Sequence, residues 1–220
     1  MITFFNNTTL NIPRSLILIL AAGFLVTIPV FIQAPLVRAY PWLSLALTLG
    51  LVSFSRQWKQ PWSSLLWGFA LTWFCGSIYW GWYRLEPLWH LPMEAMALPF
   101  ALWGLNKSQY RVGSCFYLGS LWGTIVTDLY IWLTGLIPTW QRLVDLEPDQ
   151  IITNLYTVIT LIQTPWGLGI GVMLSLSLVW LATTVLLPNA TDDRCVFAGA
   201  ILFTLVTDSL FGAGLFLLGA

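Results

Sequence analysis

The sequence predicts an all-α protein, a polytopic transmembrane helical bundle of about seven spans. Composition is the first observation, because 58% of the 220 residues are hydrophobic and only 8% are charged, whereas soluble domains carry roughly 25% charged residues. The second is a series of long apolar runs. Backbone groups in hydrocarbon must bond within the protein, so such runs suit helices. The short alternating strands of a membrane barrel do not occur in the sequence.

The predicted spans are apolar runs, since about 20 such residues cross a hydrocarbon core of about 30 Å. We expect them within a single transmembrane domain, 1–220, near residues 15–35, 41–55, 62–83, 90–106, 112–137, 165–187 and 196–219. The fourth is short, contains Pro92 and Pro99, and carries Glu94 near its start. Six full spans plus a re-entrant segment at 90–106 is therefore the alternative.

A polar connection at 138–150 leads into a segment with helical periodicity, 151–163. On a helix, Ile151, Leu155, Ile159 and Ile162 share one face, and Thr153, Thr157 and Thr160 share another. This pattern predicts an interfacial helix that lies in the headgroup plane. The alternative is that 151–163 extends the sixth span at its start.

The distribution of positive charge predicts the orientation. The first span follows a single basic residue and is interpreted as retained rather than as a cleaved signal. With seven spans, the side of the N-terminus collects Arg14, Arg56, Lys59, Lys107, Arg111 and Arg194, and the opposite side collects Arg38, Arg84 and Arg142. The positive-inside rule then predicts a cytoplasmic N-terminus and a C-terminus across the membrane.

An internal repeat relates the fifth and seventh predicted spans. Cys115, Gly119, Thr124, Val126, Thr127 and Asp128 recur, 80 positions later, as Cys195, Gly199, Thr204, Val206, Thr207 and Asp208. Matches of Cys, Gly, Thr and Asp in register are hard to obtain by chance in apolar sequence. Because two spans separate the copies, we expect a parallel repeat of helical hairpins, with a fainter third copy in the third span.

The repeat places two aspartates within spans, Asp128 and Asp208. Insertion of an aspartate at mid-span costs roughly 2.5 to 3.5 kcal/mol, so both side chains should face protein or water. Thr124 and Thr127 lie within one turn of the first, and Thr204 and Thr207 within one turn of the second. The functional interpretation is a facing pair of acids that binds a proton or cation. The structural alternative is that protonated aspartates hydrogen bond across helices and fix their packing.

Other chemistry has weaker signals. Two acids suggest an intramembrane aspartyl protease, but both sites here read Val-Thr-Asp rather than that family's Tyr-Asp and Gly-x-Gly-Asp, so an enzyme is not expected. A possible ligand pocket, walled by aromatics, comprises Arg84, Glu86, His90 and Glu94.

Cys75, Cys115 and Cys195 are interpreted as packing residues, and no metal or other cofactor is expected. Because the net charge is zero and no dense cluster of Lys or Arg occurs, nucleic acid is not expected as a partner. The lipid bilayer, and possible neighbouring membrane proteins, are the expected partners.

Four strings carry a resemblance to a known family: VFIQAPLVR (30–38), IYWGWYRLEPLWHLPMEA (78–95), FYLGSLWGTIVTDLY (116–130) and QTPWG (163–167). They resemble a family of cyanobacterial integral membrane proteins described only as a domain of unknown function. The resemblance covers nearly the whole chain and is weaker after about Leu187. It implies a cyanobacterial source and a cell-membrane or thylakoid location, and it implies no activity and no catalytic residues.

Three functional hypotheses follow from these features. The duplicated aspartates favour transport of a small solute or ion, coupled to protons. The aromatic faces and the lack of catalytic motifs favour a non-catalytic assembly or scaffold protein of a cyanobacterial membrane. The segment 79–94, with its lone histidine, favours a pigment or quinone binder, although a single histidine near a membrane surface is more often simply hydrogen bonded.

Overall fold

The computed structural model describes residues 13–145, 158–187 and 189–218. The elements in chain order are α1 (Arg14–Ile28), η1 (Pro29–Gln33), α2 (Ala34–Ala39), α3 (Pro41–Ser55), α4 (Trp62–Ile78), η2 (Tyr79–Tyr83), η3 (Pro87–Trp89), α5 (His90–Glu94), η4 (Ala95–Ala97), α6 (Leu98–Leu105), α7 (Arg111–Leu133), α8 (Ile137–Asp145), α10 (Pro165–Leu186) and α11 (Asp192–Leu218). Over these residues the predicted all-α class is confirmed, and no strand occurs among them.

Three of the helical segments are long and apolar enough to cross a membrane: Arg14–Ala39, Pro165–Leu186 and Asp192–Gly214. Their outward-facing side chains are largely apolar, as in Leu168, Val172 and Leu176 of α10, which are all exposed. A contiguous apolar exterior of this kind is solvated by lipid rather than water. The protein is therefore membrane-associated.

The longer helices overlap the ranges that the sequence predicts as spans, whereas α8 (Ile137–Asp145) falls mostly in the predicted polar connection, 138–150. The range 41–55 coincides with α3, and 62–83 coincides with α4 followed by η2. The range 90–106 is broken, because α5 has 5 residues, α6 has 8 and a short 3-10 turn separates them. Pro92 and Pro99 explain the break, since each lacks an N–H and clashes with the preceding turn.

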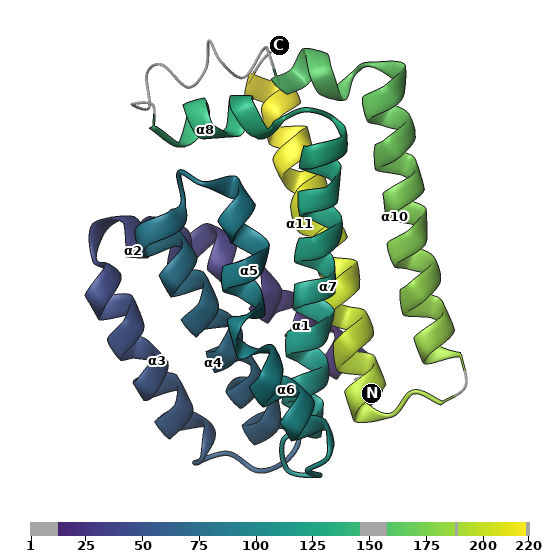
Figure 1. The fold of residues 1–220 in the computed structure, drawn as a ribbon. Coiled ribbons are helices and arrows are strands. Elements are labelled where there is room, and N and C mark those ends of the chain that lie inside the picture. Colours follow the sequence, from purple (N-terminus) through teal and green to yellow (C-terminus); the bar gives the residue numbers. More distant parts are fainter. Residues whose placement is uncertain (1–12, 146–157, 188, 219–220) are drawn as a thin grey trace, which may run out of the picture.

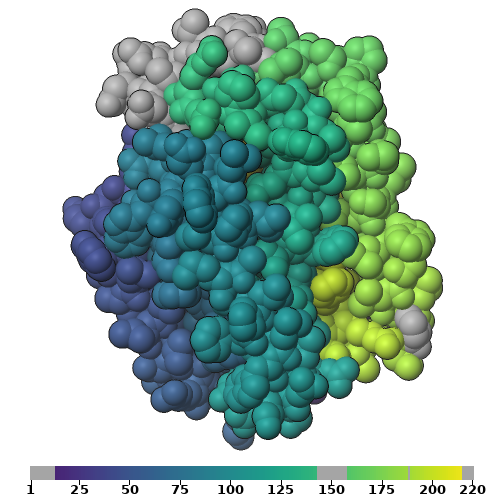
Figure 2. Space-filling view, viewed as in Figure 1, coloured from purple at the N-terminus to yellow at the C-terminus, as the bar shows by residue number. Residues whose placement is uncertain are grey.

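Helix α7 is the centre of the bundle (Figure 1) and packs against α4, α6, α10 and α11. Glycines permit the closest approaches. A Cβ on Gly113 of α7 would collide with the carbonyl oxygen of Ser64 in α4, and one on Gly123 would collide with the side chain of Thr204 in α11. Small residues at helix contacts are a general device of membrane bundles, because they let backbones pack closely. On the face shown in Figure 2, side chains close the gaps between the ribbons.

A buried polar network ties α1 and its π-helical extension to α3 and α4. Gln33 is fully buried, and its amide donates to the carbonyl of Trp73 at 2.5 Å and to the Ser77 hydroxyl at 2.9 Å. Ser77 in turn lies 2.7 Å from the Ser44 hydroxyl. Hydrogen bonds of this kind between helices fix their mutual register where the hydrophobic effect gives no preference.

One end of the bundle gathers several connections and helix starts. Arg14 pairs with Asp192 at 2.5 Å, Arg111 pairs with Asp193 at 2.9 Å, and the Gln60 amide donates to the carbonyl of Gln109 at 2.9 Å. Helices α1, α7 and α11 therefore begin at the same end. Helix α8 lies across the opposite end (Figure 1).

Most of the predicted interfacial helix, 151–163, lies outside the described residues. Within the part that the structure describes, residues 158–162 are helical. A neighbouring segment, α8, has the amphipathic character that was expected of 151–163. Helix α8, IPTWQRLVD, alternates apolar and polar residues with a helical period and lies across one end of the bundle (Figure 1). An amphipathic helix in that position is typical of a membrane–water interface.

Candidate functional site

His90 and Asp128 form a hydrogen-bonded pair between α5 and α7. The Nδ1 atom of His90 lies 2.8 Å from Oδ1 of Asp128, and the side chains are 23% and 22% exposed. His90 is the first residue of α5, placed there by the turn that begins at Pro87. Asp128 lies about a turn and a half before the end of α7. The pair is an ion pair when the imidazole is protonated and the carboxyl is ionised.

Two buried tyrosines hold the segment that carries His90. The ring of Tyr79 packs on the imidazole with centroids 4.3 Å apart, and the Tyr117 hydroxyl donates to the carbonyl of Glu94 at 2.5 Å. Both tyrosines are 1% exposed. Because one belongs to η2 and the other to α7, α5 is held from two sides and its first residue is held against Asp128.

Glu94 joins the same cluster from the far end of α5. It lies four positions after His90, which places both side chains on one helical face. Its carboxyl acts electrostatically on both His90 and Asp128. The imidazole therefore has two acidic neighbours, one on its own short helix and one on α7.

Asp208 of α11 joins the cluster through Thr127. The Thr127 hydroxyl donates to Oδ2 of Asp208 at 2.7 Å and also lies 3.1 Å from the carbonyl of Gly123. Asp208 is exposed at the molecular surface and acts electrostatically on Asp128. Polar groups from α5, α7 and α11 thus form one cluster: Glu94, His90, Asp128, Thr127 and Asp208.

The other threonines of the repeat bond to their own helices. Thr124 donates to the carbonyl of Ser120 at 3.3 Å, Thr204 to Ala200 at 3.0 Å and Thr207 to Phe203 at 2.8 Å. Hydroxyl groups within helices commonly satisfy themselves in this way. Of the four predicted hydroxyl partners, only that of Thr127 reaches an aspartate, and it reaches the one on the other helix.

The predicted ligand pocket is divided. His90 and Glu94 belong to the cluster around Asp128, whereas Glu86 is exposed. Arg84 is partly buried, and its Nε atom has no hydrogen-bond partner in the part of the chain that the structure describes. Among the described residues, no hydrogen bond or ion pair joins Arg84 or Glu86 to His90.

Sequence reasoning assigned His90 and Asp128 to separate sites and missed the contact between them. It gave the aspartates only threonine neighbours, whereas the partner of Asp128 is the single histidine of the chain. The sequence did carry a signal for one other part of the cluster: His90 and Glu94 are four positions apart, a spacing that predicts a shared helical face. The contribution of Tyr79 and Tyr117 has no signal in the sequence, because it depends on how the short α5 packs.

The described residues contain no group of three His, Cys, Asp or Glu side chains arranged to hold a metal ion. Cys75 and Cys195 are buried and Cys115 is partly buried, all three as free thiols. The cluster contains one imidazole with two acidic neighbours, Asp128 and Glu94, and a third carboxyl, Asp208, bonded to the Thr127 hydroxyl.

The fold and the cluster define the class: an all-helical, membrane-associated protein with a polar cluster held between its helices. The chain belongs to the DUF3120 family, described as a protein of unknown function, whose model matches residues 22–215. The predicted membership of a domain family of unknown function is thereby confirmed, while the cyanobacterial source stays a prediction. No curated protein matches the chain. No solved structure matches it either.

Proposed function

We propose that this protein moves protons across a membrane together with a small solute or ion. The observation that carries the proposal is the His90–Asp128 hydrogen bond, with Glu94 acting on both groups and Asp208 bonded to Thr127, the residue next to Asp128. Ionisable side chains within membrane helices are costly and mark proton relays and ion paths. Here they come from three different helices: His90 bonds to Asp128, and Glu94 and Asp208 act on the pair electrostatically, which a purely structural hydrogen bond between two helices does not require.

The relay has a simple chemical basis. When the imidazole is protonated and Asp128 is ionised, transfer of the Nδ1 proton to Oδ1 across 2.8 Å neutralises both groups. The Thr127 hydroxyl has one proton and two acceptors within reach, the Gly123 carbonyl and Asp208. If Asp208 is ionised, Thr127 donates to it. If Asp208 is protonated, its own O–H can donate to Thr127, which then donates to Gly123. Asp208 can thus be ionised or protonated while its hydrogen bond with Thr127 is kept.

The relay requires a transmembrane setting, and about seven spans are proposed for it. The helices run alternately between the two ends of the bundle, with α4, α7 and α11 in one direction and α3 and α10 in the other (Figure 1). The end that holds Arg14, Arg111 and Arg194 is proposed to be cytoplasmic, because it carries the larger number of basic residues. The C-terminus is then on the opposite side of a cell or thylakoid membrane.

The internal repeat is proposed to be the origin of the two acid sites. Its copies, α7 and α11, run side by side in the same direction (Figure 1). A Cβ on Gly119 would lie 2.7 Å from the Phe197 carbonyl oxygen of α11, and the equivalent Gly199 faces α1 in the same way, 2.5 Å from the Ile19 carbonyl oxygen. Each copy thus uses the same glycine to pack against the next helix, as duplicated hairpins would.

The test is a proton-flux assay on the purified chain in sealed liposomes that contain a pH-sensitive dye. With an imposed pH gradient, the wild-type chain should dissipate the gradient, while Asp128→Asn and His90→Gln should reduce the initial rate about 100-fold, as expected for removal of a proton-transfer group. Glu86→Gln is the matched control, since it removes an exposed carboxyl outside the cluster. Equal rates for wild type and both cluster variants, in folded protein, would refute the proposal.

One observation favours a second candidate, a pigment or quinone binder. Asp128 engages Nδ1 of His90, and no described residue bonds to Nε2. A carboxylate on one ring nitrogen orients a histidine to ligate through the other, and the Tyr79 ring 4.3 Å away supplies an aromatic wall. A visible absorption band or an extractable quinone in the purified wild type, absent from His90→Gln, would support this candidate. A colourless, quinone-free preparation would exclude it.

A further inference from the structure

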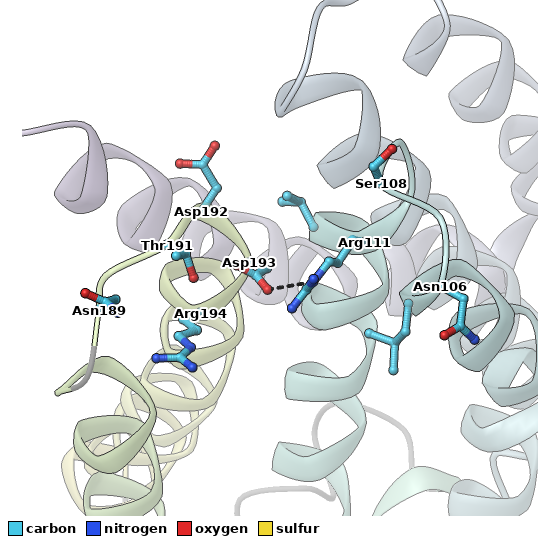
Figure 3. Close-up of a pocket in the computed structure, with 10 residues that line it drawn as sticks. Asn106, Ser108, Arg111, Asn189, Thr191, Asp192, Asp193 and Arg194 are labelled. Carbon is cyan, nitrogen blue, oxygen red and sulfur yellow. Dashed lines mark hydrogen bonds and ion pairs between the residues drawn. The ribbon is translucent and has the colours of Figure 1, made fainter.

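A second polar region lies at the end of the bundle where α7 and α11 begin, away from the acid cluster. It is a hollow of about 540 Å³. Its polar lining residues come from two places in the chain: Asn106, Ser108 and Arg111 from the connection into α7, and Asn189, Thr191, Asp192, Asp193 and Arg194 from the connection into α11. Figure 3 shows these side chains around the opening.

Charge in this hollow is incompletely balanced. Asp193 accepts from Arg111 at 2.9 Å, and Asp192 accepts from Arg14 at 2.5 Å. Arg194 is then the remaining charged lining residue, and its buried Nη1 atom has no hydrogen-bond partner among the described residues. A buried guanidinium donor without an acceptor costs free energy, because it has lost its hydrogen bonds to water. An anion in the hollow would remove that cost.

The rest of the lining suits an oxyanion. Asn106 and Asn189 supply amide donors and Ser108 supplies a hydroxyl, while the Thr191 hydroxyl is already bonded to the Asp193 carboxyl. Helix α11 begins here, with the Cys195 N–H bonded to the carbonyl of Thr191 at 2.9 Å. The backbone N–H groups before Cys195 therefore have no partner within the helix, which favours a negative group. Arginine recognises phosphate oxygens in particular, because its planar fork donates two parallel hydrogen bonds.

The hollow also lies at headgroup depth in the proposed spanning arrangement. The neighbouring Trp103 is exposed, and the Lys107 ammonium lies 6.0 Å from its ring. Tryptophan with a nearby lysine is typical of a membrane–water interface. Phospholipid phosphates are concentrated at that level.

We propose that this hollow is a binding site for a phosphate group, held by Arg194 and the surrounding amide and hydroxyl donors, and supplied either by an anionic phospholipid headgroup or by free phosphate. This inference is independent of the proton relay, because it uses none of the residues of the acid cluster. If phosphate binding is disproved, the proton relay can still be tested, and if the relay is disproved, phosphate binding can still be tested.

The experiment compares wild type with Arg194→Gln, Arg194→Lys and Arg56→Gln, all in a phosphate-free neutral detergent. Arg56 is an exposed arginine that does not line the hollow, so Arg56→Gln makes the same change of charge elsewhere. Circular dichroism and gel filtration establish that each variant is folded. One arm adds phosphatidylglycerol, a second adds phosphatidylcholine and a third adds inorganic phosphate. Bound lipid is counted by native mass spectrometry, and the thermal midpoint Tm is recorded in every arm.

Wild type and Arg56→Gln should retain one phosphatidylglycerol and gain in Tm, while Arg194→Gln should bind about tenfold more weakly, as for loss of one charged hydrogen bond. Arg194→Lys should fall between them, because lysine keeps the charge and loses the fork. A Tm rise with inorganic phosphate alone, dependent on Arg194, identifies free phosphate as the ligand. The proposal is overturned if Arg194→Gln and wild type bind the same amount of lipid and show the same Tm change in every arm. It is also overturned if Arg56→Gln loses as much lipid binding as Arg194→Gln.

Discussion

His90 of α5 and Asp128 of α7, 38 positions apart in the sequence, meet at 2.8 Å through Nδ1 and Oδ1. The contact joins a short helix between prolines to the central helix of the bundle. It also places the only histidine of the chain between two acids, Asp128 and Glu94. The proposed relay, its connection to α11 through Thr127 and the second candidate as a cofactor binder all depend on this pair.

Truncation of Asp128 should cost stability as well as function. Asp128→Ala leaves the partly buried His90 without its acceptor, a loss of about 1–3 kcal/mol, whereas Asp128→Asn keeps a hydrogen-bonding group of the same shape. We therefore expect a lower Tm for Asp128→Ala and a Tm close to wild type for Asp128→Asn, measured in the same detergent. An equal loss of Tm in both variants would mean that the negative charge itself stabilises the fold.

The Tyr117 hydroxyl should be needed to hold α5. Tyr117→Phe removes the donor to the Glu94 carbonyl and leaves a buried acceptor unpaired, at a cost of about 1–3 kcal/mol. We expect lower thermal stability and faster hydrogen exchange in α5. Tyr83→Phe is the control, since Tyr83 is 38% exposed. Identical exchange in both variants would show that α5 is held by packing alone.

The contact of α4 with α7 depends on glycine. A Cβ at Gly113 would overlap the carbonyl oxygen of Ser64, whereas one at Gly169 of α10 would meet nothing within 4 Å. Gly113→Ala should therefore destabilise the bundle by about 1–3 kcal/mol, and Gly169→Ala should leave it unchanged or stabilise it by about 0.5–1 kcal/mol. Chemical unfolding in mixed micelles measures both. A tolerated Gly113→Ala would contradict the close packing of these helices.

The two ends of the bundle should lie on opposite sides of the membrane. Single cysteines introduced at Lys59 and at Glu86, in a chain whose three native cysteines are replaced by alanine, can be labelled in intact cells with a membrane-impermeant maleimide. In the orientation proposed here, the cysteine at 86 should react and the one at 59 should react only after the membrane is opened. Labelling of both in intact cells would contradict the proposed crossing of α4.

The helices could be predicted from the sequence because their main cause is local. A run such as 41–55 is apolar and bounded by Pro41 and by the polar stretch after Ser55, and these features determine where a helix begins and ends. Even the break in 90–106 follows from Pro92 and Pro99. Composition and periodicity carry this information along the chain without reference to distant residues.

The cluster could be predicted only in part, because its contacts depend on packing between helices. The repeat identified Asp128 and Asp208, and the polar segment 79–94 identified His90 and Glu94. The sequence did not indicate that α5 would lie against α7, since five residues between prolines have no periodicity that specifies a partner. Thr127 was matched with the aspartate next to it and bonds instead to Asp208 of the parallel helix.

The most direct test of the His90–Asp128 pair uses the fact that the chain has one histidine. Protein labelled with ¹⁵N-histidine, in lipid nanodiscs, gives imidazole resonances that need no assignment. In wild type, the Nδ1 resonance should have the position of a nitrogen whose proton is shared with a carboxylate. In Asp128→Asn it should move, and in Glu86→Gln it should stay. An Nδ1 resonance unchanged by Asp128→Asn would contradict the pair, and with it the proposed relay.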